Sequence, residues 1–307
     1  MTNIRLFSLG ILGLALVSCT AGESALEKPL YEPARLIESH YDEGEPMWVG
    51  TIDRANLEEP PFDEWFDSGY ASYTPDAKTV EALASSMGSV DVEVYLGTWC
   101  SDSTRDVPRL ERILDEAGLP PERLEMVALS DHPGEFKTSP GGKERLRRIH
   151  RTPTIVVSRD GHEIGRIVQN SRESLEKDLL TIVRGEAYEP RFGAESRFHE
   201  LFTNEPVEVL EEREAAIADE LSGLGDADSL WHYAQYDLLL NDKPREAVVA
   251  LDIFLRLHPD SAKGHLLRAE ALDELGNTAE ALSAVRESLR YDPDNEKAQS
   301  LERRLSE

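Results

Sequence analysis

Basic charge and cysteine are scarce in this chain of 307 residues. It holds 33 Lys and Arg against 60 Asp and Glu, which gives a formal net charge of −27. Nucleic acids and acidic membrane surfaces are bound by clustered Lys and Arg, so this balance argues against both as partners. Two cysteines, Cys19 and Cys100, are too few for a disulfide scaffold or an all-cysteine zinc site. The eight histidines show no metal-ligand spacing, so we expect neither a metal nor another cofactor.

Residues 1–19 have the pattern of a signal peptide that ends in a cysteine. A short basic start precedes an apolar run of about a dozen residues, fewer than the roughly 20 that a membrane-spanning helix needs. Residues 16–19 resemble the lipobox of bacterial lipoproteins, which implies a signal peptide over 1–18 and a lipid anchor on Cys19. The resemblance implies a place in the bacterial cell envelope, on the periplasmic or extracytoplasmic side, and Thr20 favours the outer membrane. An ordinary secretory signal is the alternative.

The rest of the chain divides into three parts. Residues 19–45 are polar and acidic, which predicts a tether. Residues 46–190 begin with an aromatic extension and then alternate strand and helix patterns, which predicts an α/β domain. Residues 191–307 show helical patterns, which predicts an all-α domain.

The pattern within the α/β domain also predicts individual elements. Alternating apolar residues favour strands, and an Asp160-Gly161 pair between the last two favours a tight hairpin turn with positive φ at both residues. Helical spacing closed by Gly118 favours a long central helix. The expected strands cover 90–96, 124–129, 154–158 and 163–168, and the expected helices cover 75–87, 101–117, 143–149 and 174–183.

One cysteine lies at a position that carries a family resemblance. Trp99-Cys100 follows a Gly-Thr break at the end of a predicted strand and opens a helix, and Pro153 later opens the hairpin. These features resemble the thioredoxin fold over about 110 residues, and the Trp-Cys-x-Asp-Ser string resembles a bacterial thioredoxin-like subgroup. The resemblance implies a central mixed sheet flanked by helices. It also implies Cys100 as nucleophile, Pro153 as a cis-proline that faces it, and Trp99 and Thr152 as substrate contacts.

The position of Cys100 has a physical meaning of its own. Unpaired backbone N–H groups and the positive dipole end at a helix start stabilise a thiolate, the nucleophilic form of cysteine. Ser103, one turn further on, could donate a hydrogen bond to the sulfur, and Arg105 could add positive charge. Asp102 acts in the opposite direction, because a neighbouring carboxylate disfavours a thiolate. A buried and inert cysteine is the alternative.

Two departures from thioredoxins restrict the chemistry. Ser103 stands where thioredoxins have a second cysteine, so a mixed disulfide on Cys100 cannot be released by internal attack. Val94 stands where they hold a buried acid. What remains is single-thiol exchange of an isomerase-like, trapping or deglutathionylating kind, with glutathione or another small thiol as a possible partner. Alternatively, the groove beside Pro153 binds an extended peptide and the sulfur is incidental.

Four arginines precede Pro153 within a few residues. Such a cluster is typical of a solvated helix face, and contact with an acidic substrate or the carboxylates of glutathione is the alternative. The cluster comprises Arg145, Arg147, Arg148 and Arg151.

The C-terminal region repeats itself. Trp231 and His265, Ala247 and Ala281, and Pro259 and Pro293 are each 34 residues apart. This period and the pattern of small and large residues resemble tetratricopeptide (TPR) repeats, with units at about 228–261 and 262–295. Because two hairpins seldom suffice for stability, we expect further helices over 207–224 and 298–305.

Two hypotheses follow. In the first, the protein is a thiol-dependent enzyme or redox helper of the cell envelope, in which Cys100, Ser103 and Pro153 act on a substrate and the TPR surface recruits protein clients or a redox partner. In the second, both domains are non-catalytic modules of an envelope assembly factor. We favour the first hypothesis slightly, because Trp99-Cys100 and Pro153 occupy matching places.

Overall fold

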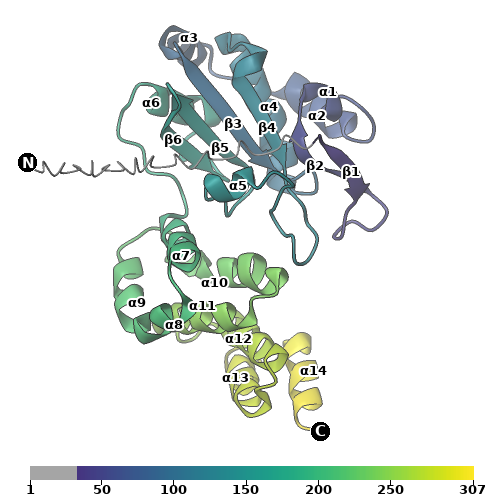
Figure 1. Ribbon diagram of the computed structural model, residues 1–307, viewed down its shortest axis with the longest axis vertical. Coiled ribbons are helices and arrows are strands. Elements are labelled where there is room, and N and C mark those ends of the chain that lie inside the picture. Colours follow the sequence, from purple (N-terminus) through teal and green to yellow (C-terminus); the bar gives the residue numbers. More distant parts are fainter. Residues whose placement is uncertain (1–32) are drawn as a thin grey trace, which may run out of the picture.

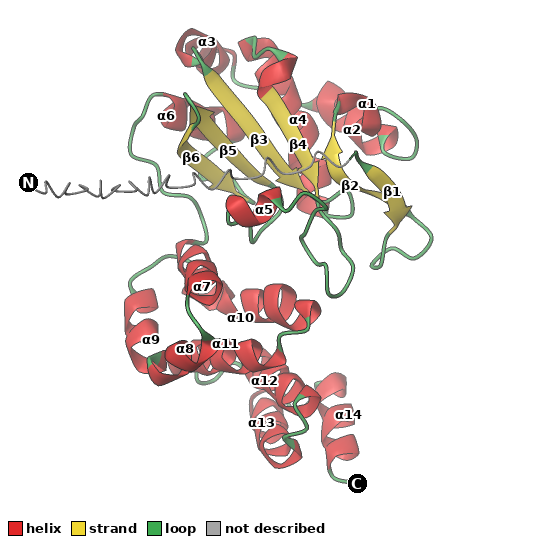
Figure 2. Cartoon of the chain, viewed as in Figure 1, coloured by secondary structure: helices red, strands yellow, loops and turns green. Residues whose placement is uncertain are grey.

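The computed structural model describes residues 33–307 (Figure 1). The predicted signal peptide at 1–18, the lipidation at Cys19 and about half of the expected tether lie outside the described residues. Among the residues described, no helix is both long and apolar enough to cross a membrane. The described chain forms an N-terminal α/β domain and then a run of packed helices, as the sequence predicts at this level (Figure 2).

A six-stranded mixed sheet organises the α/β domain. The strands lie in the order β1-β2-β4-β3-β5-β6. The central strands β3 and β4 pair in parallel, and every other neighbouring pair is antiparallel. The bounds are β1 Arg35–Glu38, β2 Pro46–Ile52, β3 Val90–Leu96, β4 Leu124–Ala128, β5 Thr154–Arg159 and β6 His162–Val168.

The two faces of this sheet are covered differently. Val92 and Val94 of β3 point into a large apolar core, whereas Tyr95 belongs to a smaller cluster with Val127 and Ile149. Successive side chains of a strand alternate between faces, so the two clusters lie on opposite sides of the sheet. The large core takes its helical residues from α1, α2, α3, α4 and α6. The face with the smaller cluster is the one left for α5 (Lys143–Leu146) and for the helical domain that begins at Gly193.

The helices α3 to α6 match their predicted positions closely, whereas α1 and α2 lie in the aromatic extension, where no helix was predicted. The central helix α4 begins after Cys100, which is its N-cap, and ends at Gly118, whose φ of 74° is the left-handed conformation that glycine adopts readily. The bounds are α1 Arg54–Leu57, α2 Asp63–Ser72, α3 Ala77–Ser86, α4 Ser101–Ala117, α5 Lys143–Leu146 and α6 Leu175–Val183, with a short 3₁₀ turn at Pro121–Arg123.

The C-terminal domain is a succession of helices. Its first core joins α7 to α11 and part of α12, and a second core joins α12, α13 and α14. The bounds are α7 Gly193–Asn204, α8 Val207–Glu212, α9 Glu214–Ser222, α10 Leu230–Tyr233, α11 Pro244–Leu257, α12 Ala262–Glu274, α13 Thr278–Tyr291 and α14 Glu296–Leu305, with a 3₁₀ turn at Ala227–Ser229. The further helices expected over 207–224 and 298–305 are therefore present.

The helix that begins at Leu230 is not a regular α-helix. Residues Ala234–Leu238 form a π-helical segment, and Leu239–Asn241 continue as a 3₁₀ turn. Such π segments widen a helix locally and often occur where a side chain is placed for a purpose. This irregular helix faces the α/β domain, as does α7.

The structure differs from the sequence-based expectation at the N-terminal side. The segment expected to be a tether contains β1, which pairs with β2 at the edge of the sheet. The aromatic extension contributes β2, which pairs with β4. The folded domain therefore begins well before residue 46. The predicted hairpin turn is confirmed, with φ of 52° at Asp160 and 78° at Gly161.

Candidate functional site

The turn between β3 and α4 places Cys100 at the start of a helix. The Cys100 N–H donates to the carbonyl of Gly97 at 3.0 Å, and its own carbonyl accepts from Thr104 in the first turn of α4. The ring of Trp99 folds over Gly97, where a Cβ atom would lie 2.6 Å from a ring carbon. Only glycine at residue 97 tolerates this approach. The Trp99 indole N–H is fixed by a 2.8 Å hydrogen bond to the carbonyl of Leu129.

The residue before Pro153 faces the sulfur. The partly buried Cys100 Sγ lies 3.5 Å from the carbonyl oxygen of Thr152, to which the thiol donates. The Thr152–Pro153 peptide bond is cis, as the family resemblance implied. The carbonyl of Pro153 accepts from the Gln169 N–H at 2.7 Å, which ties this segment to the end of β6. The structure therefore brings together Trp99, Cys100, Thr152 and Pro153.

Ser103 is placed differently from the expectation. Its side chain is fully buried, and its hydroxyl oxygen accepts a 3.2 Å hydrogen bond from the Gly97 N–H. No hydrogen bond joins it to Cys100 among the described residues. Ser103 thus holds the turn that carries Cys100, rather than contacting the sulfur directly.

The charged neighbours of Cys100 neutralise each other. Arg105 pairs with Asp102 at 2.6 Å and with Asp106 through two hydrogen bonds, so its guanidinium is engaged by carboxylates. Hydrogen bonding to Asp106 raises the pKa of Arg105. Asp102 also accepts a hydrogen bond from the Gln169 amide. The expected positive charge of Arg105 is therefore not directed at the thiol.

A pocket of about 310 Å³ opens in front of Cys100. The α/β domain contributes most of its walls, including the aromatic rings of Tyr41, Trp99 and Phe136. The Trp99 and Phe136 rings lie 5.2 Å apart, and Tyr41 meets the edge of Phe136 at 5.9 Å. Burial raises the pKa of Tyr41 to about 12, so its hydroxyl stays protonated and able to donate. The remaining lining residues are Ser101, Lys137, Arg151, Thr152, Gln169, His232 and Tyr236.

The last two lining residues come from the helical domain. Tyr236 lies in the π-helical segment, and its ring is 5.8 Å from that of Phe136. His232 lies one turn earlier, with its ring 4.6 Å from that of Tyr236. The pocket in front of Cys100 is thus completed by a second domain.

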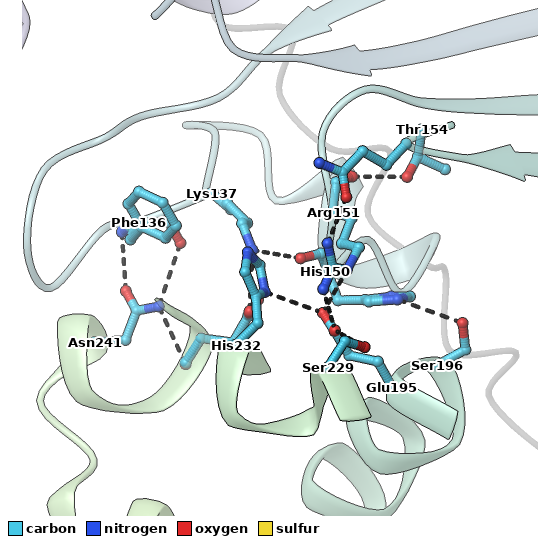
Figure 3. Close-up of polar contacts among 12 residues, drawn as sticks. Phe136, Lys137, His150, Arg151, Thr154, Glu195, Ser196, Ser229, His232 and Asn241 are labelled. Carbon is cyan, nitrogen blue, oxygen red and sulfur yellow. Dashed lines mark hydrogen bonds and ion pairs between the residues drawn. The ribbon is translucent and has the colours of Figure 1, made fainter. Parts of the chain in front are cut away.

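A buried ion pair joins the two domains behind this pocket. The Arg151 guanidinium donates twice to the Glu195 carboxylate of α7, and Figure 3 shows the two side chains reaching toward each other across the interface. Both are almost inaccessible, with side-chain exposures of 7% and 0%. The Arg151 guanidinium also lies over the ring of Phe192, 3.7 Å from its centroid. Burial alone raises the pKa of Glu195, but pairing with His232 and Arg151 lowers it to about 2.

A second buried ion pair runs parallel to the first. Lys137 donates to the carbonyl of His150 and, at 3.0 Å, to the Asp237 carboxylate of the π-helical segment. Burial raises the pKa of Asp237 to about 6, against the opposing effect of Lys137. At each of these two adjacent points, a cation of the α/β domain pairs with a carboxylate of the helical domain.

Backbone groups fasten the same interface further along. In Figure 3, Asn241 lies against Phe136, whose N–H donates to the Asn241 amide oxygen at 2.9 Å and whose carbonyl accepts from the amide nitrogen at 3.3 Å. The Gly134 N–H donates to the carbonyl of Leu240 at 2.6 Å. The end of the irregular helix therefore holds the loop after β4 by hydrogen bonds.

Three histidines in the interface are held neutral. Burial lowers the pKa of His150 to about 3 and those of His199 and His232 to about 4. The rings of His150 and His199 stack at 5.5 Å, and the Ser196 hydroxyl lies 3.3 Å from His150 Nε2. Each ring would have to be desolvated as a cation if it were protonated in place.

One group in the described part of the chain has the composition of a metal site. Ligand atoms of Glu195, His232 and Asp237 lie within 4.8 Å of one another. The two carboxylates are already paired with Arg151 and Lys137, whose fixed positive charges oppose a further cation. The group is better described as a buried ion-pair network.

Sequence reasoning missed the half of the site that comes from tertiary contacts. It placed Arg151 in a basic cluster, whereas the structure pairs it with Glu195, and Arg147 with Glu93 of β3. Tyr41 and Tyr236 gave no signal, because single aromatic residues in a loop and in a helix are ordinary. Comparisons of this chain with protein-family models, with curated proteins and with solved structures found no match.

Proposed function

We propose that the α/β domain is a thioredoxin-like domain with one active thiol, followed by TPR-like repeats. The strand β3 that ends four residues before Cys100, the helix that starts after Cys100 and the hairpin opened by Pro153 support this assignment. The two helical hairpins α10–α11 and α12–α13 occupy the proposed repeat units. A lipid-anchored position in the cell envelope, as implied by residues 16–19, is part of the same proposal.

The function that the site supports best is thiol–disulfide exchange through Cys100 alone. The observation that carries it is the placement of a partly buried sulfur at a helix N-terminus and at the wall of a pocket. Cys100 first loses its proton to solvent. Its thiolate then attacks one sulfur of a disulfide, the S–S bond breaks, and the other sulfur leaves as a thiolate that takes up a proton.

A second thiol must complete the cycle. Its thiolate attacks the mixed disulfide, forms a new S–S bond with the substrate sulfur, and releases the Cys100 thiolate. Because Ser103 occupies the position of a resolving cysteine, this second thiol is an external one, such as glutathione, or another thiol of the same substrate. The sequence therefore supports isomerase-like or deglutathionylation-like exchange.

A specific observation favours the alternative of a non-catalytic binding module. The 3.5 Å contact between Cys100 Sγ and the Thr152 carbonyl uses the thiol proton, which a thiolate does not have. Neither Ser103 nor Arg105 contributes the stabilisation that the sequence suggested. In this alternative, the pocket and the repeat surface bind partners without exchange.

The test uses the full chain with Cys19→Ser, in which Cys100 is the single thiol. Incubation with glutathione disulfide is expected to add one glutathionyl group by intact mass, and reduced glutathione is expected to remove it. Cys100→Ser in the same background must lack the adduct. A Cys100 thiol that reacts with iodoacetamide but forms no mixed disulfide would overturn the exchange function and leave the binding module.

A matched pair of variants sharpens this test. Ser103→Cys places a second thiol one helical turn from Cys100, at a Cα separation of about 5–6 Å that a disulfide can bridge. This variant is expected to release glutathione and form an internal disulfide, whereas Ser103→Ala is expected to retain the adduct. Retention by both variants would show that the turn does not present the Cys100 adduct to this position.

A further inference from the structure

The helical domain determines how much space Cys100 has in front of it. Tyr236 and His232 form the wall opposite the α/β domain, and together with Trp99 and Phe136 they line an open pocket of about 310 Å³. This volume is at the lower end of the range for small-molecule sites, about 300–1,000 Å³. It suits a small molecule or a single side chain.

The backbone beside the sulfur is covered as well. Thr152 is 4% exposed, and Arg151 and Pro153 are also buried. An extended peptide lying along this segment needs open backbone over several residues, because each extended residue spans about 3.3 Å. Binding of an extended peptide in a groove beside Pro153, the alternative that the sequence left open, does not fit the docked arrangement of the two domains.

The helical domain is held against the α/β domain by contacts at several points around the pocket. The Arg151–Glu195 and Lys137–Asp237 pairs lie behind the pocket, and the Phe136–Asn241 hydrogen bonds lie at its side. An arrangement that separates the partners of a buried ion pair but keeps them out of water leaves uncompensated buried charges, so the two pairs fix the position in which the domains dock. The Phe136–Asn241 hydrogen bonds and the contact between the rings of Phe136 and Tyr236 would be lost on opening.

We propose that the helical domain restricts Cys100 to low-molecular-weight thiols and disulfides, with Tyr236 as the residue that sets the size limit. The inference rests on the proposed exchange function and names its substrate class. A small disulfide enters beside Tyr236, Cys100 attacks one of its sulfurs, and the other sulfur leaves as a small thiolate that takes up a proton. A polypeptide disulfide reaches Cys100 only after the domains separate.

The experiment separates access from exchange by using alkylating reagents. Each forms one bond from Cys100 Sγ to a methylene carbon and expels iodide, without any disulfide. The full chain with Cys19→Ser is treated with iodoacetamide, or with an iodoacetyl group on the central lysine of a peptide of about twelve residues, which extends to roughly 40 Å. A short unstructured cysteine peptide, treated in the same way, gives the intrinsic ratio of the two alkylation rates.

The expected result is a strong preference for the small reagent. If the open arrangement is populated in fewer than about one molecule in ten, the peptide reagent is slowed at Cys100 by about tenfold or more compared with the intrinsic ratio. A ratio equal to the intrinsic one would overturn the proposal, because long chains would reach Cys100 freely. No labelling by iodoacetamide would overturn it too, because the pocket would admit not even a small molecule.

Three tyrosine variants assign the size limit. Tyr236→Ala is expected to lower the preference by at least about threefold, through widening of the pocket or a larger open population. Tyr236→Phe keeps the ring and is expected to keep the preference. Tyr291→Ala makes the same truncation on α13, where Tyr291 is 41% exposed, and is expected to change nothing. An unchanged preference in Tyr236→Ala, with the fold verified by circular dichroism, would overturn the role of Tyr236.

The same preparations then test exchange itself, with glutathione disulfide and with a disulfide of the long peptide. A size preference in alkylation without any mixed disulfide would remove the proposed function and leave the covered pocket standing. Exchange with both disulfides, at the relative rates that the short cysteine peptide shows, would leave the function standing and remove the size restriction. The two failures are therefore distinguishable.

Discussion

The apolar core under the sheet and the interface between the domains are built on different principles. The core joins valines, leucines and aromatic rings from β3, α2 and α4, and its stability comes from the burial of apolar surface. The interface places Arg151, Glu195, Lys137 and Asp237 out of water and adds three neutral histidines. Buried ion pairs contribute little net adhesion but penalise every mismatched arrangement. The interface is therefore selective about position and sensitive to charge at several residues, whereas the core depends mainly on the packing of apolar side chains.

The largest effect on the interface is expected when one partner of the Arg151–Glu195 ion pair is removed. Arg151→Ala leaves the Glu195 carboxylate buried without its cation, which is expected to cost about 3–5 kcal/mol in the docked state. We expect two separate unfolding transitions in urea. Tryptophan fluorescence and far-UV circular dichroism are used to monitor them. The paired change Arg151→Met with Glu195→Leu is expected to recover most of the loss, because it removes both charges together.

A control within the α/β domain sharpens this result. Arg147→Ala removes a similar cation from Glu93, but that pair keeps side-chain exposures of 29% and 18%. Its loss is expected to be smaller, because water can solvate the remaining carboxylate. An Arg151→Ala chain that unfolds in one transition with the stability of Arg147→Ala would contradict the division into core and interface.

A change of pH is the second test of the difference between the interface and the core. Burial places the pKa values of His150, His199 and His232 at about 3–4, below the value of about 6.5 in an unfolded chain. Between these values the unfolded chain binds more protons, so stability is fully present above about pH 6.5 and is lost as the pH falls toward 4. Two carboxyl groups oppose this trend over part of the range, because burial raises the pKa of Asp237 to about 6 and that of Glu111 on α4 to about 7.

We expect the net result to be a loss of about 2–3 kcal/mol between pH 7 and pH 5, measured as the free energy of unfolding in urea. The variant His150→Gln cannot take up a proton and is expected to show a weaker pH dependence. Its Gln can still bond to Ser196, which His150 approaches at 3.3 Å. Equal stability of the unmodified chain at the two pH values would contradict the neutral state of the histidines.

The smallest effect on the free energy of unfolding is expected from Glu111, a carboxylate within the apolar core. Burial raises the pKa of Glu111 on α4 to about 7, and its Oε1 has no hydrogen-bond partner. The folded state therefore binds this proton more tightly than the unfolded chain. This contribution is fully present below about pH 4.5 and is lost as the pH rises through about 7.

Glu111→Gln replaces the protonated acid with a neutral side chain of the same shape. It is expected to stabilise the fold by about 1–2 kcal/mol at pH 8 and to change little at pH 4, measured by thermal unfolding at both values. Glu116→Gln, on the partly exposed side of the same helix, serves as the control and is expected to show no such pH-dependent gain. Stabilisation by Glu111→Gln at pH 4 would contradict the assignment.

The sequence predicted the central part of the α/β domain well, for physical reasons that are local. The alternation of Val90, Val92 and Val94 and the helical spacing up to Gly118 are properties of neighbouring residues, and β3 and α4 begin and end where these patterns do. Strand β1 was missed because it has four residues and is mostly exposed, so it carries almost no alternation. Its position depends on pairing with β2, which is a tertiary contact.

The site was predictable to the same extent. Cys100, Thr152 and Pro153 come together because the end of β3 pairs with the start of β5, where Tyr95 lies opposite Thr154. The placement of Ser103 was not predictable, since a buried hydroxyl can accept from the Gly97 backbone as easily as it can contact a sulfur. The contribution of Tyr236 depends on how two domains dock, which no local pattern encodes.

The π-helical segment has a consequence for the register of its helix. In a regular α-helix, residues five apart point about 140° away from each other. The i→i+5 hydrogen bonds of a π segment reduce the turn per residue, so His232 and Asp237 bring their ligand atoms within 4.8 Å of each other. One surplus residue in the helix therefore lets a neutral ring and a carboxylate share a single side. Five residues of a π segment turn through nearly the same angle as four residues of an α-helix, so deleting one residue of 234–238 would restore a regular helix and leave the side chains beyond it on their present faces.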